Sequence, residues 1–458
     1  MTGYLLLMIL LASLAGYMIN RQAARAQIRA GARFHSLASF HGAYAVALSG
    51  LPALILVLLW LLLQERVLEL ITMAAIAPEH LAGLAPGELS LVKAEIRAIA
   101  DGRIFGDPEP WKREAAAYFL ALREIAATAL WAVTAAVLAI GLMIARRRVA
   151  AAFRARDRVE RVVTILMLAS AAAAILVTAG ILAALLFESI RFFQRVPVAD
   201  FLFGLNWEPQ IPLRADQIAA EGAFGWVPVF VGTLLITAIA ITVAIPIGIL
   251  SAIYLFEFAA PRTRAIAKPL LEILAGIPTV VYGFFAVLVV APALRAAGAA
   301  LGIDIAPNTA LAAGGAMGIM LIPFISSFTD DALQAVPRAL RDGSLALGAT
   351  RGETILKVLF PAALPGIVGG ILLAVSRAIG ETMIVVMAAG LIATLTLNPL
   401  DSVTTVTVQI VTLLIGDTEF DNPKTLAAFA LGLVLFLVTL ALNVVALGVV
   451  RRYRELYD

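Results

Sequence analysis

Residues Val336–Gly390 read VPRALRDGSLALGATRGETILKVLFPAALPGIVGGILLAVSRAIGETMIVVMAAG, and this stretch decides how the whole chain is interpreted. Its first part is polar and charged, although 62% of the 458 residues are hydrophobic and only 14% are charged. Its second part is an apolar segment that carries an arginine, Arg377, and a glutamate, Glu381. Ionisable side chains inside a membrane are costly. The stretch therefore indicates a charged loop followed by a spanning helix whose ionisable pair has a definite role.

The composition is typical of an α-helical membrane protein. A soluble domain of this length would carry more charge, and several apolar runs reach the ~20 residues that a helix needs to cross a bilayer. The alternating ten-residue pattern of an outer-membrane barrel is missing. The chain has no cysteine, which excludes disulfides, thiolate catalysis and cysteine metal sites. We expect an all-α polytopic membrane protein.

Apolar runs predict nine spanning segments. The arginine-rich loop at residues 146–161 is the most basic of the chain, and the positive-inside rule places it in the cytoplasm. The N-terminus is then outside and the C-terminus is cytoplasmic. A threonine-rich segment at residues 403–415 is too short to span and is predicted to be external or re-entrant. The nine segments cover approximately residues 4–19, 44–63, 125–145, 162–187, 227–256, 273–294, 309–328, 363–392 and 425–450.

The basic loop also suggests a division into two parts. Residues 1–157 are predicted to form an N-terminal extension of about three spans, with a polar external loop at residues 64–123. Residues 158–458 are predicted to form a six-span core. The phosphate-loop pattern GxxxxGK[ST] and the hydrolase patterns HExxH and GxSxG are all missing from the sequence. We therefore expect no nucleotide, metal or other cofactor on this chain, and no enzymatic activity of its own.

The loop at residues 336–361 is the most specific feature. Apolar residues within it fit two short amphipathic helices, and Gly348 allows a sharp turn between them. Such a helix pair can bind in a groove on a soluble partner. A long amphipathic loop that lies on the membrane is the alternative. The positions with recognisable spacing are Asp342, Gly343, Ser344, Gly348, Val358, Phe360 and Pro361.

This spacing resembles the EAA–G–I-x-L-P loop of ABC importer permeases, with Asp342-Gly343-Ser344 in place of Glu-Ala-Ala. Only Gly348 and Pro361 match that pattern strictly. Three further passages make residues 160–455 similar to phosphate-specific ABC permeases of the PstC type. They are LEILAGIPTVVYGFF (residues 271–285), LALGATRGETILKVLFPAALPGI (residues 345–367) and SRAIGETM (residues 376–383).

The resemblance implies a MetI-like core of six helices in a bacterial inner membrane. It implies a sister permease of the PstA type, two ATPase subunits of the PstB type that carry ATP and magnesium, and a periplasmic phosphate-binding protein. It also implies that the ATPases dock on the loop, through Asp342, Gly343, Ser344, Gly348, Arg351 and Pro361.

Arg377 and Glu381 are the second specific feature. Four residues apart, they are predicted to share one face of a helix near the middle of the eighth span. The planar guanidinium of arginine suits phosphate oxygens, since it donates two parallel hydrogen bonds. Glu381 would then orient the guanidinium and moderate its charge. An intrahelical ion pair that holds helices together is the alternative.

Thr279 and Tyr282 are further candidates for the substrate path. They follow Gly276-Ile277-Pro278, which interrupts the predicted sixth span, and interrupted helices occur where they line a cavity or pack against protein. Their hydroxyls could donate hydrogen bonds to phosphate. A proline kink with a buried tyrosine is the alternative. Two pairs of glycines with GxxxG spacing predict close helix packing, Gly314 with Gly318 and Gly366 with Gly370.

Three other functions remain open. A permease for another oxyanion, such as molybdate or sulfate, would share the loop but is not expected to carry SRAIGETM. A secondary transporter or channel would use Arg377 and Glu381 as an ion relay, but it leaves the loop unexplained. A membrane-bound sensor or scaffold would use the extension as an external ligand domain.

Overall fold

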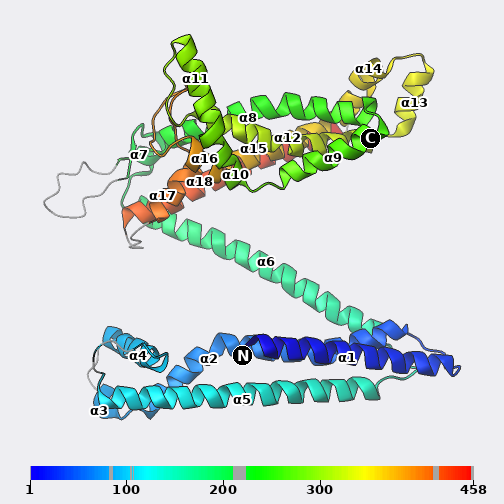
Figure 1. The fold of residues 1–458 in the computed structure, drawn as a ribbon, viewed down its shortest axis with the longest axis vertical. Helices are drawn as coiled ribbons and strands as arrows, with labels where there is room; N and C mark the ends of the chain where they lie inside the picture. Colours follow the sequence, from blue (N-terminus) through cyan, green and yellow to red (C-terminus); the bar gives the residue numbers. More distant parts are fainter. Residues whose placement is uncertain are drawn as a thin grey trace. The chain divides into compact units, whose positions relative to one another are not determined.

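The computed structural model describes residues 2–81, 86–103, 106, 108–209, 223–415 and 422–454 (Figure 1). The chain divides into two compact units, Met1–Leu176 and Val177–Asp458. This division falls inside one long helix, and the boundary predicted at residues 157/158 lies near the start of that helix. The two units are described separately below.

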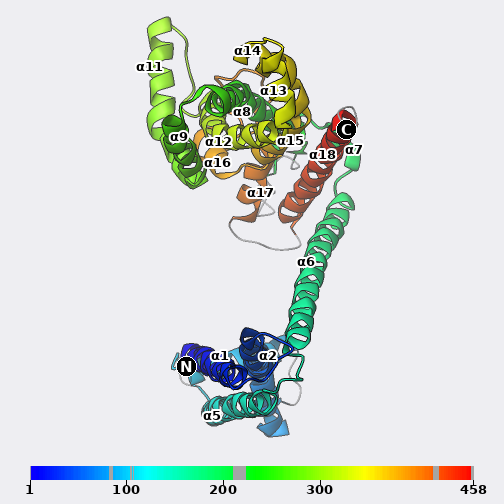
Figure 2. The ribbon, with the colours of Figure 1, turned by 90° about the vertical axis from the view of Figure 1, so that its right-hand side faces the viewer.

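The first unit is built on three long helices, α1, α2 and α5, which pack side by side (Figure 2). Their core contains Leu5, Val57 and Leu138, all less than 5% exposed. At Gly141 a Cβ atom would lie 2.7 Å from the Cα of Ser49, so α2 and α5 approach backbone to backbone. The helices are α1 (Thr2–Arg29), α2 (Ala38–Ala75), α3 (Pro78–Leu81), α4 (Pro86–Ala100), α5 (Pro110–Arg147) and α6 (Ala155–Phe193).

The second unit contains the remaining elements. It includes three π-helical segments (η1, η2 and η3), each continuous with a neighbouring α-helix. The elements are α7 (Val198–Phe203), β1 (Trp207–Glu208), β2 (Ala223–Phe224), α8 (Val227–Ile253), η1 (Tyr254–Phe258), α9 (Pro261–Ala275), α10 (Thr279–Phe285), η2 (Ala286–Val290), α11 (Ala291–Leu301), α12 (Ala310–Ala335), α13 (Arg338–Ala346), α14 (Arg351–Thr354), η3 (Ile355–Leu359), α15 (Phe360–Ile379), α16 (Met383–Ala388), α17 (Val406–Leu414) and α18 (Pro423–Arg454).

Helix α12 is the centre of the second unit. Its most apolar stretch is 61% buried, against 33% or less for any other candidate span. A Cβ on Gly318 would lie 2.8 Å from the Cβ of Val243 on α8, and a Cβ on Gly370 of α15 would lie 2.6 Å from the Cβ of Phe328 on α12. The GxxxG prediction of close helix packing is therefore confirmed on both sides of α12.

Within the described residues, nine helices are long and apolar enough to cross a membrane, as predicted. They are Gly3–Arg29, Ala38–Ala75, Pro110–Arg147, Ala155–Phe193, Val227–Phe258, Thr279–Leu301, Ala310–Ala335, Arg351–Ile379 and Pro423–Gly448. The all-α fold class is confirmed. The chain is a multi-pass membrane protein.

The predicted bounds of the sixth and eighth spans were wrong. The sixth begins at Thr279 rather than 273, because α9 ends at Ala275 and Pro278 has no N–H with which to continue the helical hydrogen bonds. The eighth ends at Ile379 rather than 392. The apolar residues after Gly380 fold into the short helix α16, whose Ile384 and Val385 are buried in the protein.

A polar loop was predicted at residues 64–123, but the described residues of this range are mostly helical. Helix α2 continues to Ala75 and α5 begins at Pro110, and between them α4 packs on α5. Val92 and Ile96 of α4 are buried there, because a polar helix with one apolar stripe can bury that stripe on its neighbour. The short segment at residues 403–415 forms α17, whose 9 residues reach only ~14 Å and cannot span a bilayer.

Candidate functional site

The loop at residues 336–361 forms a pair of short helices, α13 and α14, as predicted. Between them Gly348 has a φ of +86°, in the left-handed region that only glycine enters readily. Helix α14 begins with a capping box, in which the side chains of Thr350 and Glu353 each bond the other's backbone N–H. The two helices lie beyond the ends of α8, α12 and α15 (Figure 1).

The tip of this loop is apolar and exposed. The Leu347 side chain is 91% exposed and that of Leu356 is 71% exposed. The base is buried instead: Ile355 and Leu359 pack in a cluster with Leu333 of α12 and with Ile253 at the end of α8. One face of η3 therefore anchors the loop to the bundle, while Leu347 at the turn and Leu356 on η3 stay exposed.

The residues predicted to contact an ATPase are distributed over both helices. Asp342 and Gly343 of α13 are exposed, as is Arg351 at the start of α14. The Ser344 hydroxyl lies 3.0 Å from the Thr354 hydroxyl and so joins α13 to α14. Pro361 is the second residue of α15 and directly follows η3 in one helical stretch from Arg351 to Ile379.

An ion pair that sequence reasoning missed connects the loop to α8. An Nη2 of Arg341 on α13 donates to Oε1 of Glu257 on η1 at 2.7 Å. The Glu257 side chain is only 2% exposed, and its second oxygen has no partner among the described residues. The available signal was an acidic residue at the end of an apolar span, but its partner lies 84 positions away in the sequence.

Arg377 lies in the last turn of α15. A cation is favoured there, because the helix C-terminus carries partial negative charge. The side chain is exposed, and its guanidinium carbon lies 5.7 Å from the ring centre of Phe324 on α12. The preceding residue, Ser376, donates a hydrogen bond to Asn443 Oδ1 of α18 at 2.8 Å. Arg377 thus stands at a junction of α12, α15 and α18.

The prediction that Glu381 shares a helix face with Arg377 was wrong. Helix α15 ends at Ile379, and both residues belong to the described part of the chain, where no ion pair joins them. The Glu381 carboxylate instead accepts from the N–H groups of Met383 and Ile384, at 3.1 and 3.5 Å, at the start of α16. Its carbonyl accepts from the Thr407 hydroxyl at 2.9 Å. Glu381 therefore stabilises the turn between α15 and α16 through these hydrogen bonds.

Tyr282 follows the break between α9 and α10. Its side chain is 5% exposed, and its hydroxyl donates to the carbonyl oxygen of Leu274 at 2.8 Å. That hydrogen bond joins α10 to α9 across the break. It agrees with the alternative to a role in the substrate path, a proline kink with a buried tyrosine. Thr279, the first residue of α10, is half-buried. The structure does not bring Thr279 or Tyr282 into contact with Arg377.

A second charged cluster was also missed. Asp330 of α12 is buried, and its carboxylate accepts from Arg264 Nη2 at 3.0 Å, from Lys268 Nζ at 2.6 Å and from Gln334 Nε2 at 2.8 Å. Sequence reasoning treated Arg264 and Lys268 as loop charges, whereas both lie on α9. The cluster borders a cavity of about 340 Å³ between α8, α9 and α12.

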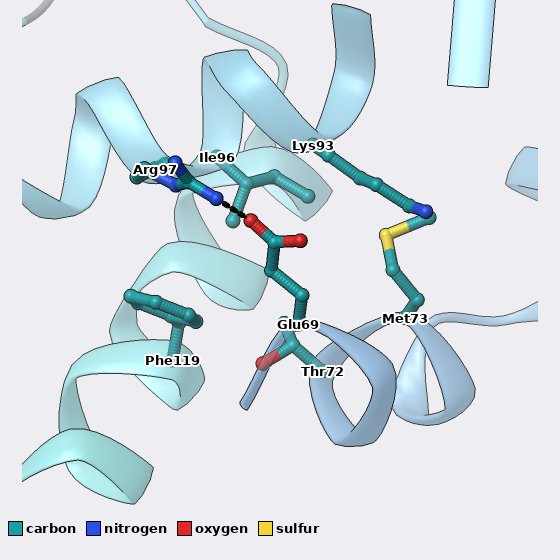
Figure 3. Close-up of a pocket in the computed structure, with 7 residues that line it drawn as sticks. All are labelled: Glu69, Thr72, Met73, Lys93, Ile96, Arg97 and Phe119. Atoms are coloured by element: carbon teal, nitrogen blue, oxygen red, sulfur yellow. Dashed lines mark ion pairs between the residues drawn. The ribbon is translucent and has the colours of Figure 1, made fainter. Parts of the chain in front are cut away.

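The first unit contains a small pocket between α2, α4 and α5 (Figure 3). Glu69 and Arg97 form an ion pair across it. Its volume is about 10 Å³, room for a single water molecule. This pocket is too small for a solute. The candidate site remains the second unit's loop together with Arg377, the two features that the sequence singled out.

Comparisons with known proteins agree with this choice. Residues 6–177 match a family described as a phosphate ATP-binding cassette transporter. Residues 244–455 match the family described as the binding-protein-dependent transport system inner membrane component. The second match covers both the loop and Arg377.

This chain matches individual relatives over most of their length. A Bacillus subtilis protein named probable ABC transporter permease protein YqgH is 32% identical over 60% of this chain and 85% of its own. Phosphate transport system permease protein PstC 1 of Mycobacterium tuberculosis is 31% identical over 55% of this chain and 81% of its own. A probable phosphate transport system permease protein PstA of Methanocaldococcus jannaschii is 31% identical over 48% of this chain and 73% of its own length.

Proposed function

This chain belongs to the permeases of ABC importers, the inner membrane components of binding-protein-dependent transport systems, and we propose that it forms part of the path by which inorganic phosphate crosses the membrane. The permease is a subunit rather than an enzyme. ATP hydrolysis belongs to its partner subunits, because the chain carries no phosphate-loop sequence.

One observation carries the proposal: a single helix joins the loop to Arg377. Helix α15 starts directly after η3 and contains Arg377 in its last turn. Its 20 residues make a helix of about 30 Å, with Pro365 inside it. A displacement of the loop by an ATPase would therefore reach the arginine through one continuous helix.

The loop supplies a suitable surface for an ATPase. Leu347 is exposed at the turn and Leu356 on η3, and the exposed Asp342 and Arg351 add charge to the same loop. An apolar centre with a polar rim is typical of protein interfaces. The Arg341–Glu257 ion pair extends the contact to α8, so the motion of an ATPase would act on two spanning helices together.

The remaining partners are those that membership of this family implies. One MetI-like unit leaves Arg377 exposed, and a sister permease, of the PstA type, would complete the wall of the path around it. Two PstB-like ATPases and a periplasmic phosphate-binding protein complete the assembly. The basic loop at residues 146–161 would face the cytoplasm of a bacterial cell, with the N-terminus outside.

Arg377 suits a phosphate ion chemically. Its guanidinium presents five N–H donors in a plane and never loses its charge. The aromatic ring of Phe324 lies beside it and limits the directions in which it can turn. Glu381 has a different role from the one predicted: by capping α16 it fixes the chain direction just beyond the arginine.

The test is phosphate uptake by the complete complex in proteoliposomes. Arg377→Ala is expected to reduce uptake of labelled phosphate to the background level while the complex still assembles, and Arg377→Lys to restore only part of it. Arg295→Ala is the matched control, because this exposed arginine of another span lies outside the proposed path. Normal uptake by Arg377→Ala, or uptake of labelled molybdate or sulfate in preference to phosphate, would overturn the proposal.

A further inference from the structure

The cavity between α8, α9 and α12 lies at the same end of the second unit as the loop. Asp330, on its wall, is five positions from the end of α12, and the loop begins directly after that helix. The cavity volume of about 340 Å³ equals roughly ten water molecules at ~30 Å³ each. It therefore has room for a tetrahedral oxyanion with part of its hydration shell.

The charges at this cavity favour an anion. Arg264 and Lys268 contribute two positive charges, and the buried carboxylate of Asp330 balances only one of them. Glu272 also lines the cavity, but its side chain is exposed, so solvent screens it more strongly than Asp330. The hydrogen-bonded group of Arg264, Lys268 and Asp330 carries a net charge of +1, and Glu272 makes the lining as a whole neutral.

Both cations still have donors to offer. Arg264 reaches Asp330 through Nη2 alone, although a guanidinium has five N–H donors. Lys268 uses one of the three N–H donors of an ammonium group on Asp330. Ser327 also lines the cavity, and its exposed hydroxyl has no hydrogen-bond partner among the described residues. Arginine, lysine and a free hydroxyl form a donor set that suits phosphate oxygens.

Phe324 connects this cavity to Arg377. The ring lines the cavity, and the Arg377 guanidinium carbon lies 5.7 Å from its centre. One aromatic side chain is thus in contact with both the proposed translocation arginine and the second cationic site.

We propose that the cavity is an exit site for inorganic phosphate on the ATPase side of the permease, formed by Arg264, Lys268 and Ser327 and moderated by Asp330. The proposal rests on the function proposed above. Phosphate that leaves Arg377 enters this cavity and is released from it. Asp330 keeps the affinity low, because two unbalanced cations would retain a divalent anion. The same site accepts phosphate from the ATPase side when its concentration there is high.

The test measures inhibition of uptake by phosphate enclosed on the ATPase side of proteoliposomes that contain the complete complex. The concentration for half-inhibition should follow the charge of the cluster. Lys268→Gln removes a charge-assisted hydrogen bond and should raise that concentration about tenfold. Asp330→Asn should lower it by a similar factor and slow maximal uptake. The double variant, with the charge back at +1, should lie near the unmodified protein.

Several results would overturn the proposal. If all three variants keep the half-inhibiting concentration of the unmodified complex, the cluster is only a structural link between α9 and α12, or the cavity holds a lipid headgroup. Arg262→Gln is the control, since this exposed arginine of α9 does not line the cavity, and it should change nothing. If Lys268→Gln fails to assemble, Asp330→Asn and the double variant decide by themselves. Loss of the proposed function would be seen separately, as normal uptake by Arg377→Ala.

Discussion

Gly318 and Gly315 both lie on α12, but they have different surroundings, and this difference gives a quantitative prediction. A Cβ on Gly318 would lie 2.8 Å from Val243 Cβ and 2.9 Å from the Ala240 carbonyl oxygen of α8. Carbon atoms in contact prefer about 3.5 Å or more, so α8 and α12 would have to separate by roughly 0.7 Å. Around Gly315 no heavy atom lies within 4 Å of the same position.

The two alanine variants should therefore shift the free energy of unfolding in opposite directions. Alanine is favoured over glycine inside a helix by about 1 kcal/mol, and Gly315→Ala should gain up to that amount. Gly318→Ala gains the same term but loses about 3 kcal/mol to overpacking, because neither a backbone oxygen nor a branched valine can turn away. We expect a net destabilisation of about 2 kcal/mol for Gly318→Ala.

The measurement is the thermal melting of the purified protein in detergent, followed by tryptophan fluorescence at one heating rate. A loss of about 2 kcal/mol corresponds to a melting temperature lower by roughly 2–4 °C for a unit or chain of this length. Gly315→Ala should melt at the same temperature as the unmodified protein or slightly above it. Equal melting temperatures for the two variants would refute the close approach of α8 and α12.

Three further predictions concern the loop and the helix break. Arg341→Gln leaves the Glu257 carboxylate buried without its partner and should uncouple ATP hydrolysis from phosphate uptake. The double variant that also carries Glu257→Gln should recover part of the coupling. If it recovers none, the two residues are not directly linked. Leu347→Asp should prevent ATPase subunits from co-purifying. Leu397, which is also exposed but lies outside the loop, provides the control Leu397→Asp. Tyr282→Phe removes one buried hydrogen bond and should cost about 1 kcal/mol in thermal stability while uptake persists; complete loss of uptake would instead place the hydroxyl in the phosphate path.

The sequence predicted the features that depend on local composition. Nine apolar runs gave nine spans, because the length of an apolar run is set by the thickness of the bilayer. Gly348 predicted the turn between α13 and α14, since few other residues adopt its positive φ. The same reasoning overextended the eighth span, because residues 383–388 are as apolar as a spanning helix although they are buried against the protein.

The candidate site was predicted only in part. Arg377 could be identified from its cost inside an apolar segment, but its neighbour Phe324 lies on another helix. Glu381 was assigned to the wrong helix, because four-residue spacing implies a shared face only while the helix continues. Gly380 ends α15 between the two residues, and propensity alone does not fix where a helix ends.

By itself, the sequence determined that this protein is a multi-pass helical permease, with a charged two-helix loop leading into the helix of Arg377. Each of those features is carried by neighbouring residues, through hydropathy, glycine geometry and charge. Only the tertiary structure decided which charges meet: Arg341 with Glu257, and Arg264 and Lys268 with Asp330. Those partners are more than sixty positions apart. Only the packing of α9 on α12, and the position of α13 beside η1, brings them within reach of a hydrogen bond.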